Sequence, residues 1–124
     1  MIKITQLSYK YDDNYTLKNI SLNIAEGDYL AVIGANGSGK TTLIKHLNSL
    51  LLPTKGDVLV DDINTKKDSW EIRKKVGMVF QNSEDQLVTS IVEEDIAFGL
   101  ENLGIPTNEI KARVKEALKR LGIE

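Results

Sequence analysis

Apolar and polar residues alternate over the first part of the chain in a way that predicts two strands joined by a turn. The first strand runs from Ile2 to the aromatic pair Tyr9 and Tyr11. The composition of residues 12–14, Asp-Asp-Asn, is typical of a turn. Alternating apolar positions then predict a second strand that ends near Ile24.

Two short apolar runs, residues 29–33 and 76–80, have the pattern of strands buried on both faces of a parallel sheet. A further strand is expected over residues 56–60, closed by a turn at Asp61-Asp62. These strands alternate with helices later in the chain. The order favours an α/β architecture.

Helical spacing of apolar residues predicts four helices: one that begins near Lys40 and is stopped by Pro53, and others over residues 69–75, 90–103 and 107–121. Pro53 follows the first helix and Gly122 follows the last. Asp68 with Glu71, and Ser90 with Glu93, have the spacing of capping boxes. Thr107 is expected to cap the last helix.

Residues 34–41, Gly-Ala-Asn-Gly-Ser-Gly-Lys-Thr, lie between a predicted buried strand and a predicted helix, which is the context of a phosphate-binding loop. Glycines at 34, 37 and 39 let consecutive backbone N–H groups turn toward one phosphate. The helix that follows directs the positive end of its dipole to the same place. Lys40 can carry the charge for the β- and γ-phosphates, and the Thr41 hydroxyl can ligate Mg²⁺.

The loop and its surroundings resemble the ATP-binding subunits of ABC transporters, in the branch called energy-coupling-factor importers. The resemblance rests on residues 34–42, on the upstream SYKYDDNYTLKNISLNIAEGDYLAVIG and on the downstream VGMVFQNSEDQLVTSIVEEDIAFGLENLGIP, and it covers essentially the whole chain. It implies a P-loop NTPase fold, made of a small antiparallel β-subdomain and part of a parallel-sheet core. It also implies that ATP and Mg²⁺ are the cofactors.

The same resemblance assigns roles to single residues. Tyr11 matches the aromatic residue that stacks on adenine, whereas Tyr9 is expected to be a core residue. The nucleotide would be held by Gly34, Ala35, Asn36, Gly37, Ser38, Gly39, Lys40, Thr41 and Thr42, with Thr42 on the α-phosphate side. Gln81 matches the glutamine that reaches Mg²⁺ and the attacking water. Residues 82–92 would lie near the surface that docks on a transmembrane subunit.

Segments that the family uses for hydrolysis are missing between Met1 and Glu124. These are the Leu-Ser-Gly-Gly-Gln-like signature, the apolar strand with its terminal aspartate, the catalytic glutamate and the switch histidine. Because phosphoryl transfer needs charge stabilisation on both sides of the γ-phosphate, the 124 residues alone are expected not to hydrolyse ATP. We therefore expect residues 1–124 to be the N-terminal part of one ABC-type ATP-binding domain, with an apolar sheet edge left exposed.

Charge and composition exclude several classes of partner and site. A net charge of −2 gives no general attraction to nucleic acid, and the absence of cysteine excludes disulfides and thiolate metal sites. No run approaches the roughly 18 apolar residues of a membrane-spanning helix. The partners are instead implied by the resemblance: a transmembrane coupling subunit, a substrate-binding membrane subunit and a second ATP-binding subunit, identical or related, at the cytoplasmic face of the cell membrane.

Three functions compete at this point. The first is an ATPase subunit that energises import of cobalt, other metal ions or vitamins. The second is a natural short module that binds nucleotide without turnover. The third, a small-molecule kinase, lacks a lid segment with paired arginines. The acidic cluster at residues 93–95 is interpreted as a helix first turn, where the dipole favours carboxylates, and not as a metal site.

Overall fold

An antiparallel sheet occupies the first part of the computed structural model, which describes residues 1–123 apart from the side chains of Ser83 and Asp85. Its strands lie in the order β2-β1-β3-β4. They are β1 (Ile2–Tyr11), β2 (Asn14–Ile24), β3 (Lys55–Val60) and β4 (Ile63–Asn64). The two strands predicted before residue 25 and the strand predicted over 56–60 are thereby confirmed.

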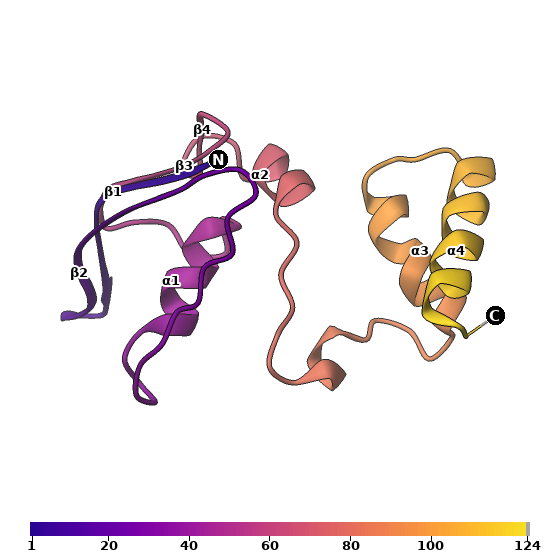
Figure 1. Cartoon of the computed structure of the whole chain (residues 1–124), viewed down its shortest axis with the longest axis horizontal. Coiled ribbons are helices and arrows are strands. Elements are labelled where there is room, and N and C mark those ends of the chain that lie inside the picture. The colour runs from indigo at the N-terminus through magenta and orange to yellow at the C-terminus, as the bar shows by residue number, and fades with distance from the viewer. Residues whose placement is uncertain (124) are drawn as a thin grey trace. The chain divides into compact units, whose positions relative to one another are not determined.

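The chain divides into two units, Met1–Met78 and Val79–Glu124. In the first unit, Figure 1 shows α1 (Lys40–Leu47) against the sheet and α2 (Ser69–Lys75) after β4. The core lies between the sheet and α1. Its buried members come from three strands and the helix: Ile4, Leu7, Leu17, Leu43 and Val58.

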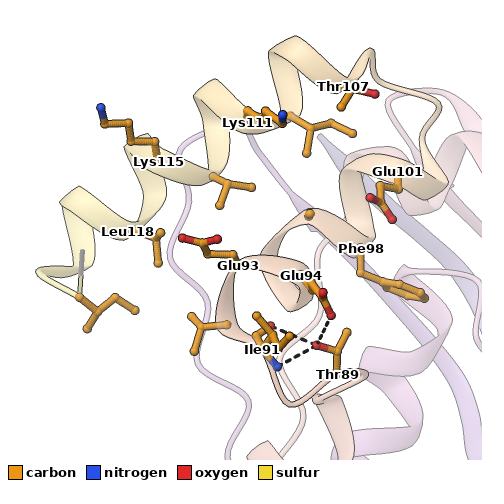
Figure 2. Close-up of a pocket in the computed structure, with 15 residues that line it drawn as sticks. Thr89, Ile91, Glu93, Glu94, Phe98, Glu101, Thr107, Lys111, Lys115 and Leu118 are labelled. Carbon is orange, nitrogen blue, oxygen red and sulfur yellow. Dashed lines mark hydrogen bonds between the residues drawn. The ribbon is translucent and has the colours of Figure 1, made fainter.

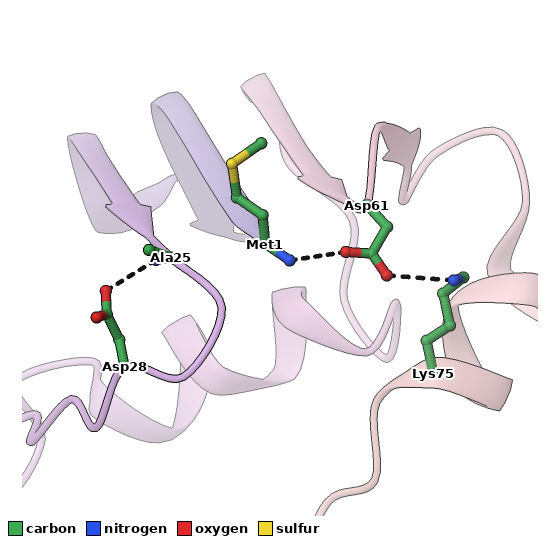
Figure 3. Close-up of polar contacts among 5 residues, drawn as sticks. All are labelled: Met1, Ala25, Asp28, Asp61 and Lys75. Carbon is green, nitrogen blue, oxygen red and sulfur yellow. Dashed lines mark hydrogen bonds and ion pairs between the residues drawn. The ribbon is translucent and has the colours of Figure 1, made fainter.

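The predicted turn at Asp61-Asp62 is confirmed and also carries an ionic network. Both residues have positive φ, 46° and 64°, as a tight hairpin turn of the primed type requires. Asp61 Oδ1 accepts a hydrogen bond from the Met1 ammonium at 2.7 Å, and Asp61 Oδ2 accepts one from Lys75 at 3.1 Å (Figure 3). One carboxylate thus connects the start of β1, the β3–β4 turn and the end of α2.

The second unit consists of a short 3-10 helix, η1 (Ser83–Gln86), and two longer helices, α3 (Val92–Asn102) and α4 (Thr107–Leu121). Helices α3 and α4 pack side by side (Figure 1). Ile110, Val114 and Leu118 are buried at their contact. The apolar spacing that predicted the last helix therefore corresponds to a packing face.

The two strands predicted over residues 29–33 and 76–80 are wrong for this structure. Both segments are irregular, and Ile33 and Val79 are 91% and 88% exposed. An apolar run becomes a central strand only where neighbours satisfy its backbone groups on both edges. Among the described residues every strand pairing is antiparallel and belongs to β1–β4, so neither segment has such a neighbour.

Helix ends also differ from expectation. Helix α1 stops at Leu47 and not near Pro53, because Ser49 adopts φ +59° and its carbonyl accepts a hydrogen bond from Arg73. Ser90 does not cap α3; the chain before that helix is instead held by Asp95 Oδ1, which accepts a bond from the Val88 N–H at 2.8 Å. Thr107 is the first residue of α4 and makes no cap bond, since Pro106 precedes it at the cap position.

Candidate functional site

Residues 34–39 form a compact loop that ends in α1. Ser38 N–H donates to the Ala35 carbonyl at 3.2 Å, which closes a turn inside the loop. Gly39 precedes the first helical residue with φ +93°, a conformation that L side chains rarely adopt. A Cβ atom at Gly34 would lie 2.7 Å from Ser38 Oγ, so the Ser38 hydroxyl would have to move to admit a larger residue. The requirement for glycine is stronger at Gly39, because its φ disfavours any L side chain.

The Lys40 ammonium lies back over this loop. Its Nζ donates to the carbonyl oxygens of Gly34 at 2.8 Å and Ala35 at 2.7 Å. A lysine ammonium has three donors, and these two bonds use two of them. The positive charge is therefore held at the loop by backbone that surrounds the expected phosphate position.

The N-terminus of α1 has a different charge pattern from the other helices. In the described part of the chain, α2, α3 and α4 each carry an acidic residue in the first turn, whereas α1 carries none. No side chain caps the first N–H groups of α1. The positive end of its dipole and these orphan donors remain available to an anionic ligand, which fits a polyphosphate.

Thr41 and Thr42 occupy the first turn of α1 with unequal exposure. Thr41 is exposed and Thr42 is half-buried. The Thr42 carbonyl accepts a hydrogen bond from His46 Nδ1 at 2.7 Å. His46 is fully buried, and burial lowers its pKa, against the opposing effect of the Thr42 and Leu52 carbonyls.

Tyr11 lies at the end of β1 and is 55% exposed. Its ring contacts Tyr9 edge-to-face, with centroids 5.3 Å apart. Tyr9 is half-buried and packs against the core, as expected. The contact of Tyr9 with His46 was not foreseen from the sequence, because no local spacing connects a strand residue to a helix residue so far along the chain.

Gln81 is exposed and lies in an irregular segment of the second unit. The strand that was expected to end at Gln81 is not formed, for the reason given above. Tyr11 and residues 34–42 both belong to the first unit and are linked there only indirectly, through β2 and α1, while the role of Gln81 stays a prediction.

A groove of about 980 Å³ lies in the second unit, between α3, α4 and the segment before α3 (Figure 2). Thr89, Ile91 and Val92 line it, and all three belong to the predicted docking segment 82–92. Thr89 Oγ1 accepts a bond from the Ile91 N–H at 2.9 Å, which fixes the turn at the groove's edge. Glu93, Glu94, Lys111 and Lys115 also line it, so the groove has charged groups of both signs.

The acidic cluster at residues 93–95 lies in the first turn of α3, as interpreted from the sequence. Among the described residues there is no group of three or more histidine, cysteine, aspartate or glutamate side chains that could hold a metal ion. The helices within residues 1–123 also include none long and apolar enough to cross a membrane.

Comparison with known proteins gives a consistent family. Residues 17–124 match the ABC transporter family. The chain is 49% identical, over 99% of its length, to the energy-coupling factor transporter ATP-binding protein EcfA1 of Clostridioides difficile. It is also 49% identical, over its whole length, to the cobalt import ATP-binding protein CbiO of Syntrophus aciditrophicus.

Solved structures agree. CbiO1 of Clostridium perfringens, part of the ABC transporter complex CbiONQ, superposes with a TM-score of 0.82 at 39% identity over 99% of this chain. The ATP-binding cassette MJ0796, solved as a dimer with ADP and phosphate, gives a TM-score of 0.76 at 32% identity. The chain covers 47% and 46% of the two sequence relatives and 51% of the CbiO1 chain, so it spans about half of their length.

Proposed function

Since this chain belongs to the ABC transporter family, we propose that residues 34–42 bind the phosphates of MgATP and that the chain is the nucleotide-binding part of a transport ATPase. The observation that carries the proposal is the Lys40 ammonium, bonded to the Gly34 and Ala35 carbonyls beside an uncapped helix N-terminus without acidic residues. This arrangement concentrates positive potential where a triphosphate needs it.

Other residues complete the proposed site. The Thr41 hydroxyl ligates Mg²⁺, Thr42 contacts the α-phosphate side, and the exposed ring of Tyr11 stacks on adenine. In the longer protein, Gln81 would be the residue that contacts Mg²⁺ and the attacking water, as the resemblance to the family implies. The metal ion supplies neutralisation of the β- and γ-phosphate charge during transfer.

We propose further that residues 1–124 are the N-terminal part of one ABC-type ATP-binding domain. Support comes from the exposed apolar segments 29–33 and 76–80, and from relatives about twice as long. On this proposal the 124 residues bind nucleotide but do not hydrolyse it alone. The intact mass of the protein from its natural source tests this. A mass near twice 13.8 kDa is expected, whereas a mass of 13.8 kDa would favour a binding module without turnover.

The branch and the partners are proposed from the named relatives. Relatives called EcfA1 and CbiO favour an energy-coupling-factor importer of vitamins, cobalt or other metal ions. The partners would be a transmembrane coupling subunit, a substrate-binding membrane subunit and a second ATP-binding subunit, at the cytoplasmic face of the membrane. The groove beside residues 89–92 is the surface that we assign to docking on the coupling subunit.

Substitution of Lys40 tests the nucleotide site. Lys40→Ala removes the counter-charge of the β- and γ-phosphates, and charge-assisted bonds of this kind are each worth about 1.5–3 kcal/mol. We therefore expect the dissociation constant for MgATP, measured by isothermal titration calorimetry, to rise by roughly tenfold or more.

Lys45→Ala is the matched control, because Lys45 lies in the last turn of the same helix and has the same charge. Its affinity for MgATP should stay within about twofold of the unchanged chain, since dipole and surface-charge effects are small. An equal loss in both variants would indicate a general charge effect. No loss with Lys40→Ala would contradict the proposed site.

A further inference from the structure

The hairpin of β1 and β2, which has Tyr11 at the end of β1, contacts the last residue of the phosphate loop at one point and helix α1 at another. The first is Gly39, where an added Cβ atom would lie 2.9 Å from Leu17 Cδ2 and 3.2 Å from the Thr16 carbonyl oxygen, both in β2. Leu17 is paired across the hairpin with Tyr9. The loop residue before α1 therefore lies directly against the strand that neighbours the tyrosines.

The second point is aromatic. The Tyr9 ring contacts His46 of α1 with centroids 4.7 Å apart and an interplanar angle of 75°, and it contacts Tyr11 at 5.3 Å and 90°. Tyr9 thus stands between the helix that follows the phosphate loop and the exposed ring of Tyr11. Both contacts are edge-to-face, the arrangement that aromatic pairs favour.

His46 has a defined orientation in this row of rings. Its Nδ1 lies 2.7 Å from the Thr42 carbonyl oxygen, and a carbonyl can only accept, so Nδ1 carries the proton. Because His46 is fully buried on the helix that begins at Lys40, its ring is held in a fixed place relative to the phosphate loop.

We propose that Tyr9 and His46 are positioning residues, which hold the Tyr11 ring at a set distance from the phosphate loop so that one ligand reaches both. The inference rests on the proposed function, since it takes Tyr11 as the adenine platform. On this proposal the specificity of the site depends on the contact between Tyr9 and His46. The Tyr11 ring that they hold favours a nucleotide over a bare polyphosphate, whereas the phosphate loop binds either one.

The test compares two probes, MgATP and magnesium tripolyphosphate, titrated into the same chain by calorimetry. The ratio of their dissociation constants measures the preference for the base. Tyr9→Leu keeps an apolar side chain but removes both ring contacts, so the preference should fall by roughly two- to tenfold. Tyr9→Phe keeps the ring edges and should keep the preference. Affinity for tripolyphosphate should change by less than about twofold in both.

A double-mutant cycle separates positioning from support of the fold. Tyr11→Ala should itself lower the preference by at least about fivefold, as loss of base stacking does. If Tyr9 acts through Tyr11, Tyr9→Leu should lower the preference no further in that background. A full additional loss, or an equal loss for both probes, would overturn the inference.

Substitution of His46 in α1 tests the same contact with Tyr9, and it provides the test if the Tyr9→Leu variant does not fold. His46→Leu should lower the preference, whereas His46→Phe keeps a ring edge for Tyr9 and should retain it. Equal preference in the two variants would overturn the inference. Failure of the unchanged chain to bind either probe would overturn the proposed function itself, a result distinct from these.

Discussion

His46 is the only histidine of the chain, and its side chain is fully buried beside Tyr9. Burial lowers its pKa, so the folded chain holds the ring neutral while the unfolded chain protonates it near pH 6.5. Below that pH the unfolded state therefore binds a proton that the folded state does not, which favours unfolding. The free energy of unfolding is unaffected by the protonation of His46 above about pH 6.5, and it falls as the pH is lowered toward the folded-state pKa.

We therefore expect the free energy of unfolding, from urea titrations, to fall between about pH 6.5 and 5. His46→Phe keeps an aromatic ring but cannot titrate, so its stability should be flat over this range. The carboxylates of Asp57 and Asp61 titrate at lower pH, because Asn64 and the Met1 ammonium respectively lower their pKa values. An unchanged slope in His46→Phe would show that another group is responsible.

Single residues of the site differ in how far sequence could reveal them. Lys40 and its loop were predictable, because the bonds to Gly34 and Ala35 join residues only a few positions apart. The place of His46 was not, because its contact with Tyr9 exists only after β1 and α1 have packed together. Gln81 remains a prediction based on resemblance.

Among the elements, α2 has the clearest local cause. Asp68 Oδ1 accepts a hydrogen bond from the Glu71 N–H at 3.0 Å, and the helix occupies residues 69–75 as predicted. Asp68→Ala removes this cap and should cost about 1 kcal/mol of stability. In urea titrations the midpoint should fall while the slope stays unchanged.

Lys67→Ala is a suitable control, since Lys67 is exposed and its backbone N–H, which alanine retains, donates to the Asn64 carbonyl. Its midpoint should stay within the error of the unchanged chain. A loss in Asp68→Ala no larger than in this control would mean that α2 is held by the burial of Ile72 and not by its cap.

Helices and strands, like single residues, can be predicted from sequence to the extent that their contacts are local in the chain. A capped helix such as α2 makes its hydrogen bonds with residues close in sequence, so its local sequence can predict it. A central strand does not, because its hydrogen bonds belong to its neighbours. Residues 29–33 and 76–80 have the composition of buried strands, yet they form none in a sheet whose pairings are all among β1–β4.

On the scale of the whole molecule, protection from hydrogen exchange should divide the chain sharply. Amides in the paired parts of β1 should exchange slowly, and those of residues 29–33 and 76–80 at nearly the rate of an unstructured peptide. In a chain extended to the length of the relatives, the same amides should become protected. Slow exchange of the amides of residues 29–33 and 76–80 in the 124-residue chain would contradict their exposed arrangement. Slow exchange that appears only at high protein concentration would indicate that these segments pair between copies of the chain.

The pairing of β1, β2 and β3 also affects the order in which parts of the chain can fold during synthesis. All partners of this sheet lie within the first 64 residues, so it can form while the rest of a chain is still being synthesised. On the proposal that the domain is twice as long, residues 29–33 would then stay exposed to solvent until the strands that pair with them are synthesised. At about 5–20 residues per second the wait lasts many seconds. During that interval the apolar segment is a natural binding site for a chaperone.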